Sequence, residues 1–253
     1  MMYKAKKQDA IILKYEGREV LVLNENSLDG YNNFIVDKLI KYSELPNQHQ
    51  GNRSRVLDFG AGIGTLADIW FTKRSERIDC LEIDKAQSEV ISKKGFRIYN
   101  SLDSIDVKYN FIFTSNVLEH IDDDKATITQ LQKLLHPNGR IAIYVPAFML
   151  LFSELDEAVG HYRRYSMKEI KEKVLEADLR VIHVQYVDSL GFLASLLVRI
   201  IGYKSHGNLG GSRSLEFYDR FVFPLSRMID FCGVRYFLGK NIFLVAEKIS
   251  TPQ

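Results

Sequence analysis

Apolar residues along this chain occur in short runs, and between the runs they recur at helical spacing. The short runs predict strands at Arg55–Phe59, Ile78–Ile83, Phe96–Tyr99, Phe111–Thr114, Arg140–Val145, Arg180–Val187 and Asn241–Glu247. Helical patterns lie between them, up to Trp70 and at Lys85–Lys94, Asp123–Leu135 and Ser166–Ala177. Strands that alternate with helices of this length indicate the α/β class, with a doubly wound, mostly parallel sheet covered by helices on both faces.

The N-terminal segment departs from this alternation. Two apolar stretches within residues 10–23 favour a short hairpin, and residues 29–45 carry apolar side chains at helical spacing. The polar stretch Pro46–Ser54 is typical of a linker. The sequence therefore predicts an N-terminal cap segment over residues 1–50 and a main domain over residues 51–253.

The amino-acid composition is ordinary for a globular protein and excludes few functional classes. The chain has 253 residues, 46% of them hydrophobic, and its 34 basic and 32 acidic residues leave a net charge of +2. So small a charge, with no basic stripe, gives no reason to expect a nucleic-acid partner. The N-terminus lacks the apolar stretch of a signal peptide, so we expect a cytoplasmic protein. No Cys/His cluster has metal-ligand spacing, and we expect no metal ion.

The most informative stretch is VLDFGAGIGTLA, residues 56–67. A predicted strand runs into Gly60, Gly62 and Gly64, and a predicted helix follows. Glycine is needed where the backbone has a positive φ or where a ligand touches main-chain atoms. Glu82 stands eighteen residues past Gly64, at the end of the next predicted strand, where a carboxylate can accept both hydroxyls of a ribose. The alternative is that these glycines only form a tight strand-to-helix turn.

The glycine spacing separates two classes of ligand. Dinucleotide-binding loops have the pattern G-x-G-x-x-G, whose third glycine allows close helix packing. Here the pattern is G-x-G-x-G and Thr65 follows. This spacing favours a nucleoside without a pyrophosphate over the dinucleotide of an NAD-dependent oxidoreductase, which stays an alternative.

The stretch resembles motif I of the class I S-adenosylmethionine-dependent methyltransferases, and the similarity extends over residues 31–187. The resemblance implies a Rossmann-like seven-stranded sheet and S-adenosyl-L-methionine as cofactor. It implies that Glu82 holds the ribose, that Ile83 packs on the adenine, and that a backbone N–H of Leu102 contacts the adenine. The cofactor-binding residues it implies are Asp58, Gly60, Ala61, Gly62, Gly64, Glu82, Ile83, Ser101, Leu102, Asp103, Ser115 and Asn116.

Methyl transfer from a sulfonium is an in-line displacement, which requires mainly that donor and acceptor are held close and aligned in a dry site. The long connection Pro146–Ser166 follows a central strand and is a candidate for the acceptor site. Its GHYRRY segment also occurs in a subgroup of these methyltransferases. His161 is a candidate general base, and His120 is a second one. The acceptor-binding candidates are Tyr31, Phe148, Phe152, Tyr162, Arg163 and Arg164.

Two of these segments have an alternative structural interpretation. GHYRRYS could be the entry to a helix, with Ser166 as its N-cap and Glu169 completing a capping box, and His161 could only fix the loop. The acidic run Asp122–Asp124 is better interpreted as a helix N-terminus than as a metal site.

A predicted helical insertion over residues 189–239 precedes the last strand. It could be a lid over a hydrophobic acceptor, a homodimer surface, a membrane-surface contact through residues 190–203, or helices packed on the sheet. The sequence as a whole predicts a methyltransferase acting on a small-molecule or lipid-like acceptor. A non-catalytic binding protein that retains the fold is the second alternative.

Overall fold

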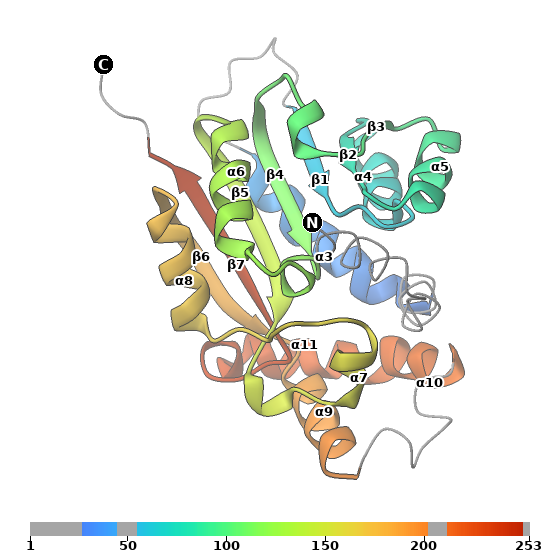
Figure 1. Ribbon diagram of the computed structural model, residues 1–253. Coiled ribbons are helices and arrows are strands. Elements are labelled where there is room, and N and C mark those ends of the chain that lie inside the picture. The colour runs from blue at the N-terminus through green and yellow to red at the C-terminus, as the bar shows by residue number, and fades with distance from the viewer. Residues whose placement is uncertain (1–26, 45–54, 202–211, 250–253) are drawn as a thin grey trace, which may run out of the picture.

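The computed structural model describes residues 27–44, 55–201 and 212–249. Within this part of the chain, seven strands form one sheet in the order β3-β2-β1-β4-β5-β7-β6 (Figure 1). The strands are β1 (Val56–Phe59), β2 (Asp79–Leu81), β3 (Arg97–Tyr99), β4 (Tyr109–Ser115), β5 (Leu135–Pro146), β6 (Leu179–Val187) and β7 (Asn241–Lys248). The hairpin predicted within residues 10–23 and the linker predicted at Pro46–Ser54 lie outside the described residues.

Helices connect these strands and cover both faces of the sheet. The α-helices are α3 (Asp29–Ser43), α4 (Thr65–Arg74), α5 (Lys85–Lys93), α6 (Asp124–Leu134), α7 (Glu154–Ala158), α8 (Met167–Glu176), α9 (Ser189–Ile201), α10 (Ser212–Phe217) and α11 (Phe223–Phe231). Only β7 runs antiparallel to its neighbours β5 and β6 among the described strands. The predicted doubly wound, mostly parallel sheet is therefore confirmed.

Side chains that alternate along the strands pack into two separate hydrophobic cores, one on each face of the sheet. On β4, Ile112 packs on one side with Ile128 of α6 and Ile170 of α8. Phe111 and Phe113 point to the other side, where they join the core formed with α3, α4 and α11. Since both faces of the central strands are buried, β1 is buried throughout and its sequence is almost uniformly apolar.

The chain order around the sheet fixes where a ligand can bind. The chain passes from β1 through β2 to β3 along one side of the sheet, and β4 then returns to the opposite side of β1. Strand order reverses between β1 and β4, and ligands of open α/β sheets bind outside the carboxyl ends of strands at such a point.

Two helix boundaries follow the predicted capping. Asp123 caps α6 by accepting from the backbone N–H of Ala126, and Ser166 caps α8 by accepting from that of Glu169. The interpretation of Asp122–Asp124 as a helix N-terminus is confirmed.

One boundary was predicted wrongly. The sequence places a helix up to Leu135 and a strand from Arg140, with the turn residues Pro137–Gly139 between them, but β5 already begins at Leu135, paired with Tyr109. Asn138 takes a left-handed φ of 61°, and pairing resumes at Arg140 opposite Phe111 after a register shift. A local irregularity thus absorbs the turn residues without ending the strand.

The insertion before β7 is anchored by two buried aspartates. Asp188 accepts hydrogen bonds from the hydroxyls of Tyr218 and Ser226, at 2.6 and 2.9 Å. Asp230 on α11 accepts from the backbone N–H groups of Asp188 and Ser189. Phe223 of α11 is buried in the core beneath α3. The insertion therefore packs against the sheet end along one side of its helices.

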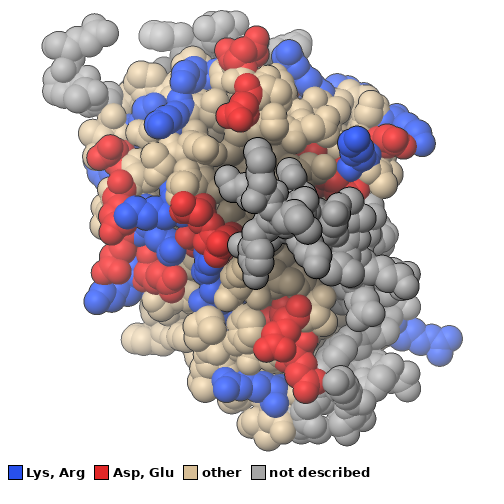
Figure 2. Space-filling model, viewed as in Figure 1, with Lys and Arg blue, Asp and Glu red and all other residues tan. Residues whose placement is uncertain are grey.

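Surface charge is mixed on the face seen in Figure 2, where acidic and basic side chains are interleaved over α6 and α8. Ion pairs such as Lys125–Glu176 and Lys168–Glu172 contribute to this pattern. Among the described residues, no helix is both long enough and apolar enough to cross a membrane.

Candidate active site

The glycine loop connects β1 to α4. Gly60, Gly62 and Gly64 have φ values of 80°, 58° and 81°, which side chains strongly disfavour. The backbone N–H groups of Gly60 and Ala61 both donate to the carbonyl of Leu81, at 2.9 and 3.0 Å. The loop is thereby fixed against the end of β2.

Gly60 also lies against the segment that follows β4. A Cβ atom placed on Gly60 would lie 2.3 Å from Cγ2 of Val117. A side chain is therefore excluded at Gly60 by sterics as well as by φ. The resemblance implies that the segment 115–120, which includes Val117, borders the methionine and the acceptor, but nothing in the sequence indicated the contact of Val117 with Gly60.

Glu82 is positioned directly over the loop. Its Oε2 accepts the backbone N–H of Gly62 at 2.9 Å, and its Oε1 accepts that of Asp84 at 2.8 Å. Burial raises the pKa of Glu82 above its ordinary value, although the hydrogen bonds from Asp84 and Gly62 partly oppose this. The carboxylate is thus held in one orientation beside the glycine loop.

Ile83, the next residue, points outward from the protein. Its side chain is 76% exposed, whereas Leu81 and Glu82 before it are buried. A large apolar side chain next to the glycine loop offers a flat surface on which a base could pack.

The loop after β3 completes this side of the site. Ser101 precedes a 3-10 turn, Leu102–Ser104; Leu102 packs on the core, and Ser101 and Asp103 are exposed. Asn100 was not predicted, yet its Nδ2 donates to the carbonyl of Glu82 at 2.9 Å and so joins β3 to the end of β2.

The remaining predicted cofactor residues lie at the ends of β1 and β4. Asp58 is buried on β1, and Ser115 is the last residue of β4. Asn116 follows with a left-handed φ of 53°, and its N–H donates to the carbonyl of Tyr144 at 2.8 Å. The fold therefore brings all the predicted cofactor residues to the carboxyl ends of four adjacent strands, β3, β2, β1 and β4.

The connection from β5 to α8 folds back on itself at the same edge of the sheet. Ala147 pairs with Tyr165, and Phe148 donates its N–H to the carbonyl of Tyr165 at 2.8 Å. The N–H of Tyr162 donates to the carbonyl of Glu119 at 2.8 Å, which joins the connection to the segment after β4.

The aromatic candidates differ in exposure. Phe148 stacks on Tyr186, with ring centroids 4.8 Å apart, and Phe152 is half-buried. Tyr162 is 58% exposed. Phe148 and Phe152 thus pack within the β5–α8 connection, and Tyr162 is exposed on the surface of the protein.

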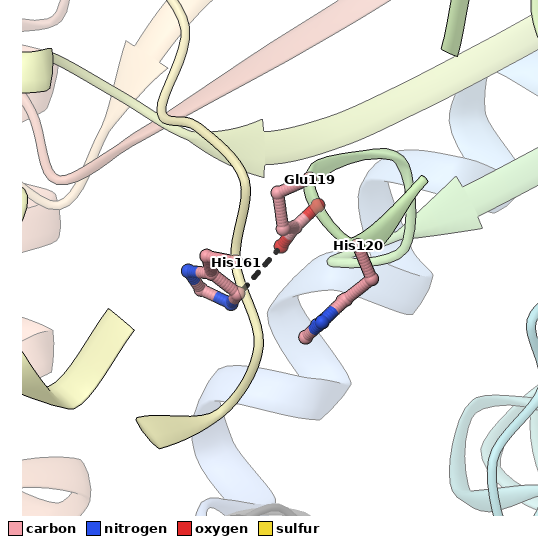
Figure 3. A group of neighbouring side chains, drawn as sticks. All are labelled: Glu119, His120 and His161. Carbon is pink, nitrogen blue, oxygen red and sulfur yellow. Dashed lines mark ion pairs between the residues drawn. The ribbon is translucent and has the colours of Figure 1, made fainter. Parts of the chain in front are cut away.

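His161 and His120 come together although 41 positions separate them in the chain (Figure 3). Their rings meet edge to face with centroids 4.6 Å apart. Nδ1 of His161 lies 2.7 Å from Oδ1 of Asp156, and its Nε2 lies 3.9 Å from Oε1 of Glu119. Asp156 was not predicted, and Glu119 was expected only as part of the segment 115–120 that borders the acceptor, because acidic residues in a loop carry no sequence signal of a pairing with His161.

Burial controls the charges of this group. It raises the pKa of Glu119 to about 8. It lowers the pKa of His120 to about 4, and the neighbouring His161 adds to this effect. Burial also disfavours the charge on Asp156, but hydrogen bonds with His161 and Arg164 outweigh it and bring its pKa to about 2.

The two candidate arginines are bound to groups of this chain. Arg164 is buried and contacts both carboxylate oxygens of Asp156, at 2.8 and 3.1 Å. Arg163 donates to the carbonyls of Ile121 and Asp122 and pairs with Asp124 at 3.0 Å. This geometry favours fixing the loop over clamping an acceptor.

Tyr31, the last candidate, lies away from these groups. Its hydroxyl is 2.6 Å from that of Tyr144 and accepts from Nδ2 of Asn241 at 2.6 Å. Its ring is buried against Phe223. These contacts join α3 to the sheet and leave Tyr31 little surface for a ligand.

A glycine loop with a carboxylate over it, at the switch point of a doubly wound sheet, defines a nucleoside-binding α/β protein. Residues 31–184 match the family model described as a methyltransferase domain. This match covers more than half of the chain, and the chain belongs to that family.

Individual relatives are distant. Probable polyketide synthase 14 of Dictyostelium discoideum is 24% identical over an alignment of 162 residues, and the match covers 53% of this chain and 5% of that protein. The cyclopropane synthase MmaA2 from Mycobacterium tuberculosis has a TM-score of 0.56 at 12% identity, covering 85% of this chain and 83% of its own. Phosphoethanolamine N-methyltransferase 2 of Haemonchus contortus has a TM-score of 0.54 at 17% identity, covering 86% and 53%.

These comparisons confirm the predictions of a class I methyltransferase and of S-adenosylmethionine as its cofactor. At identities this low, the likeness to solved structures shows that this chain shares their fold, and it does not show that it shares their methyl acceptors.

Proposed function

We propose that this chain transfers the methyl group of S-adenosylmethionine to a small-molecule or lipid-like acceptor at the carboxyl edge of β4 and β5. The observation that carries the proposal is the Glu82 carboxylate fixed on the N–H of Gly62. A bound ribose would find there a carboxylate already oriented to accept its hydroxyls.

The test is isothermal titration of the purified protein with S-adenosylhomocysteine, with NADH as control. Micromolar binding of S-adenosylhomocysteine alone supports the proposal. Binding of NADH alone would favour an oxidoreductase, and binding of neither would favour a non-catalytic protein that retains the fold.

Each residue around the glycine loop contacts the part of the cofactor that suits its chemistry. Glu82 binds the ribose, Ile83 offers the adenine an apolar surface, and the backbone at Leu102 contacts the adenine edge. Asp58 and the segment Ser115–Asn116 border the methionine end. S-adenosylmethionine supplies an electrophilic methyl group, so the protein needs mainly to align the acceptor and exclude water.

His161 and His120 stand on the acceptor side of this arrangement. Asp156 fixes the ring of His161 through Nδ1 at 2.7 Å, which turns Nε2 inward toward Glu119. We propose that these side chains border the acceptor atom, and that Phe148 and Phe152 provide apolar surface beside it.

A lipid-like acceptor is favoured by the surface of the insertion. Met149 and Leu150 of the β5–α8 connection are more than half exposed, and so are Leu197 and Ile200 of α9, which packs beside that connection. The later part of the insertion also carries large exposed apolar side chains, at Phe217, Phe221, Leu225, Met228, Phe231, Tyr236 and Phe237.

On the helices of the insertion the exposed charges are mostly basic. Arg199, Arg213, Arg220 and Arg227 are exposed, and Glu216 is an exposed acid; Asp230 is buried and Asp219 is hydrogen-bonded to the N-terminus of α3. Apolar side chains flanked by arginines suit the surface of an anionic bilayer. We propose that the insertion rests on such a membrane surface and presents the site to a lipid-like acceptor.

Flotation with vesicles of phosphatidylglycerol and phosphatidylcholine tests this contact. The protein should float with mixed vesicles and far less with pure phosphatidylcholine. The double substitution Phe231→Ser and Phe237→Ser should abolish flotation, while Leu175→Ser, at an exposed apolar position on α8, should not. A dimer in solution that the double variant dissociates would contradict the membrane contact and identify a homodimer surface.

A further inference from the structure

Three potential ligand atoms converge where the segment after β4 meets the β5–α8 connection. Glu119, His120 and His161 each offer one such atom, and the three atoms lie within 4.8 Å of one another (Figure 3). Two imidazoles and one carboxylate form the ligand set of many catalytic zinc sites. Spacing along the chain did not indicate this group, because 41 positions separate His161 from His120.

The carboxylate of Glu119 lacks the partners that a buried acid normally has. Its side chain is 0% exposed, and neither of its oxygens has a hydrogen-bond partner within the described ranges. Buried polar groups are almost always hydrogen-bonded, so each exception calls for an explanation. A bound cation would satisfy both oxygens.

His120 presents a similar exception. Its Nδ1 is buried and has no hydrogen-bond partner in the described part of the chain. A neutral, buried imidazole with an unpartnered ring nitrogen can bind a metal ion.

His161 has the second contact that metal-binding histidines typically make. Its Nδ1 lies 2.7 Å from Asp156, and the opposite nitrogen faces Glu119. A carboxylate on the outer ring nitrogen fixes the tautomer and directs the other nitrogen to the metal.

The local charge does not oppose a cation. Arg164 is the nearest buried positive side chain, and it is neutralised by two contacts with Asp156. Zinc ligands lie about 2.0–2.2 Å from the ion, hence about 3.4 Å from one another, so ligand atoms up to 4.8 Å apart would close by up to about 1.4 Å around it.

We infer that Glu119, His120 and His161 bind one divalent transition-metal ion, of which Zn²⁺ fits the ligand set best. Three protein ligands leave a fourth position open. In the proposed methyl transfer, on which this last step rests, that position would take a hydroxyl oxygen of the acceptor and lower its pKa. The proton would leave to solvent, the oxygen would form the new bond to the methyl group, and the bond from that methyl to the sulfonium would break to leave S-adenosylhomocysteine.

The experiment measures metal content directly. The 253-residue chain, without a histidine tag, is stripped with a chelator, incubated with Zn²⁺, dialysed and analysed by mass spectrometry for metals. One zinc per chain is expected. Titration with Co²⁺ should produce the visible absorption of a site with nitrogen and oxygen ligands.

Variants locate the ion. His161→Ala and Glu119→Gln should each lose the bound zinc, whereas His136→Ala, an exposed histidine on β5, should retain it. Asp156→Asn should weaken zinc affinity about 10- to 100-fold, as expected for an outer contact. Retention of full zinc by His161→Ala would overturn the inference, and so would wild-type protein that retains none.

Binding of S-adenosylhomocysteine is measured on the same samples. Normal titration shows that a variant is folded. Wild-type protein that binds S-adenosylhomocysteine but no zinc would overturn the metal site alone, and protein that binds zinc but not S-adenosylhomocysteine would overturn the proposed methyl transfer alone.

Discussion

The carboxylate of Glu82 accepts the backbone N–H of Gly62 at 2.9 Å, across twenty positions of sequence. This hydrogen bond joins the loop after β1 to the end of β2, so that the flexible glycine segment and the acidic side chain form one preorganised surface. Preorganisation matters because a ligand then binds without first ordering the loop.

Removing that carboxylate should weaken the cofactor site. In Glu82→Ala we expect the affinity for S-adenosylhomocysteine to fall by about 1–3 kcal/mol, since charge-assisted hydrogen bonds to the ribose are lost. Isothermal titration measures it. Glu89→Ala, an exposed acid on α5, is the control and should bind normally. Unchanged affinity in Glu82→Ala would remove Glu82 from the site.

Gly60 should tolerate no side chain. Gly60→Ala combines an unfavourable φ of 80° with a contact of 2.3 Å to Val117. We expect S-adenosylhomocysteine binding to be lost, with a drop in unfolding free energy of about 1–3 kcal/mol.

Gly233→Ala is the matched control for Gly60→Ala, because Gly233 has a positive φ of 107° but no atom within 4 Å of its Cβ position. It should lose stability and retain binding. Equal binding by both variants would contradict the steric role of Val117.

His161→Ala should lower turnover without changing cofactor affinity. The ring lies beside Glu119 and His120 and not against the glycine loop, so we expect a decrease of about 100-fold or more in kcat. The measurement is a labelled-methyl assay with an identified acceptor, alongside titration of S-adenosylhomocysteine. A variant with normal kcat would reduce His161 to a loop-fixing residue.

Asp124 should make stability depend on acid pH. Burial alone would raise its pKa, but hydrogen bonds from Lys173, Tyr165 and Arg163 outweigh burial and lower it. A lowered folded-state pKa stabilises the protein above the ordinary aspartate value of about 3.9, and this contribution disappears as pH falls through the lowered pKa.

In Asp124→Asn we therefore expect a loss of about 2–4 kcal/mol at neutral pH, because two cationic side chains lose their partner. Urea unfolding from pH 7 to 3 should show this difference constant above pH 5 and smaller near pH 3. Glu176→Gln, in an exposed ion pair with Lys125, should change little at any pH. A difference independent of pH would exclude the charge of Asp124 as its cause.

The sequence by itself determined the sheet and the cofactor loop. Strands such as Phe111–Thr114 are apolar on both faces because helices cover both sides of the sheet, and a continuous apolar run is a strong local signal. The loop at Gly60, Gly62 and Gly64 could also be predicted from the sequence, because a positive φ restricts the residue type at each position.

The boundary at Pro137–Gly139 was misjudged for a related reason. Local propensity predicted a turn there, but pairing with β4 resumes beyond the irregularity and keeps the segment in β5. Tertiary hydrogen bonding outweighed the local preference.

Only the tertiary structure decided how the acceptor side is built. Arg163 and Arg164 carry a sequence signal for anion binding, yet Asp124 and Asp156 neutralise them. Glu119 and His161 meet only because the β5–α8 connection folds back onto the end of β4. Such contacts depend on the path of a loop through space, and neither periodicity nor spacing along the chain encodes that path.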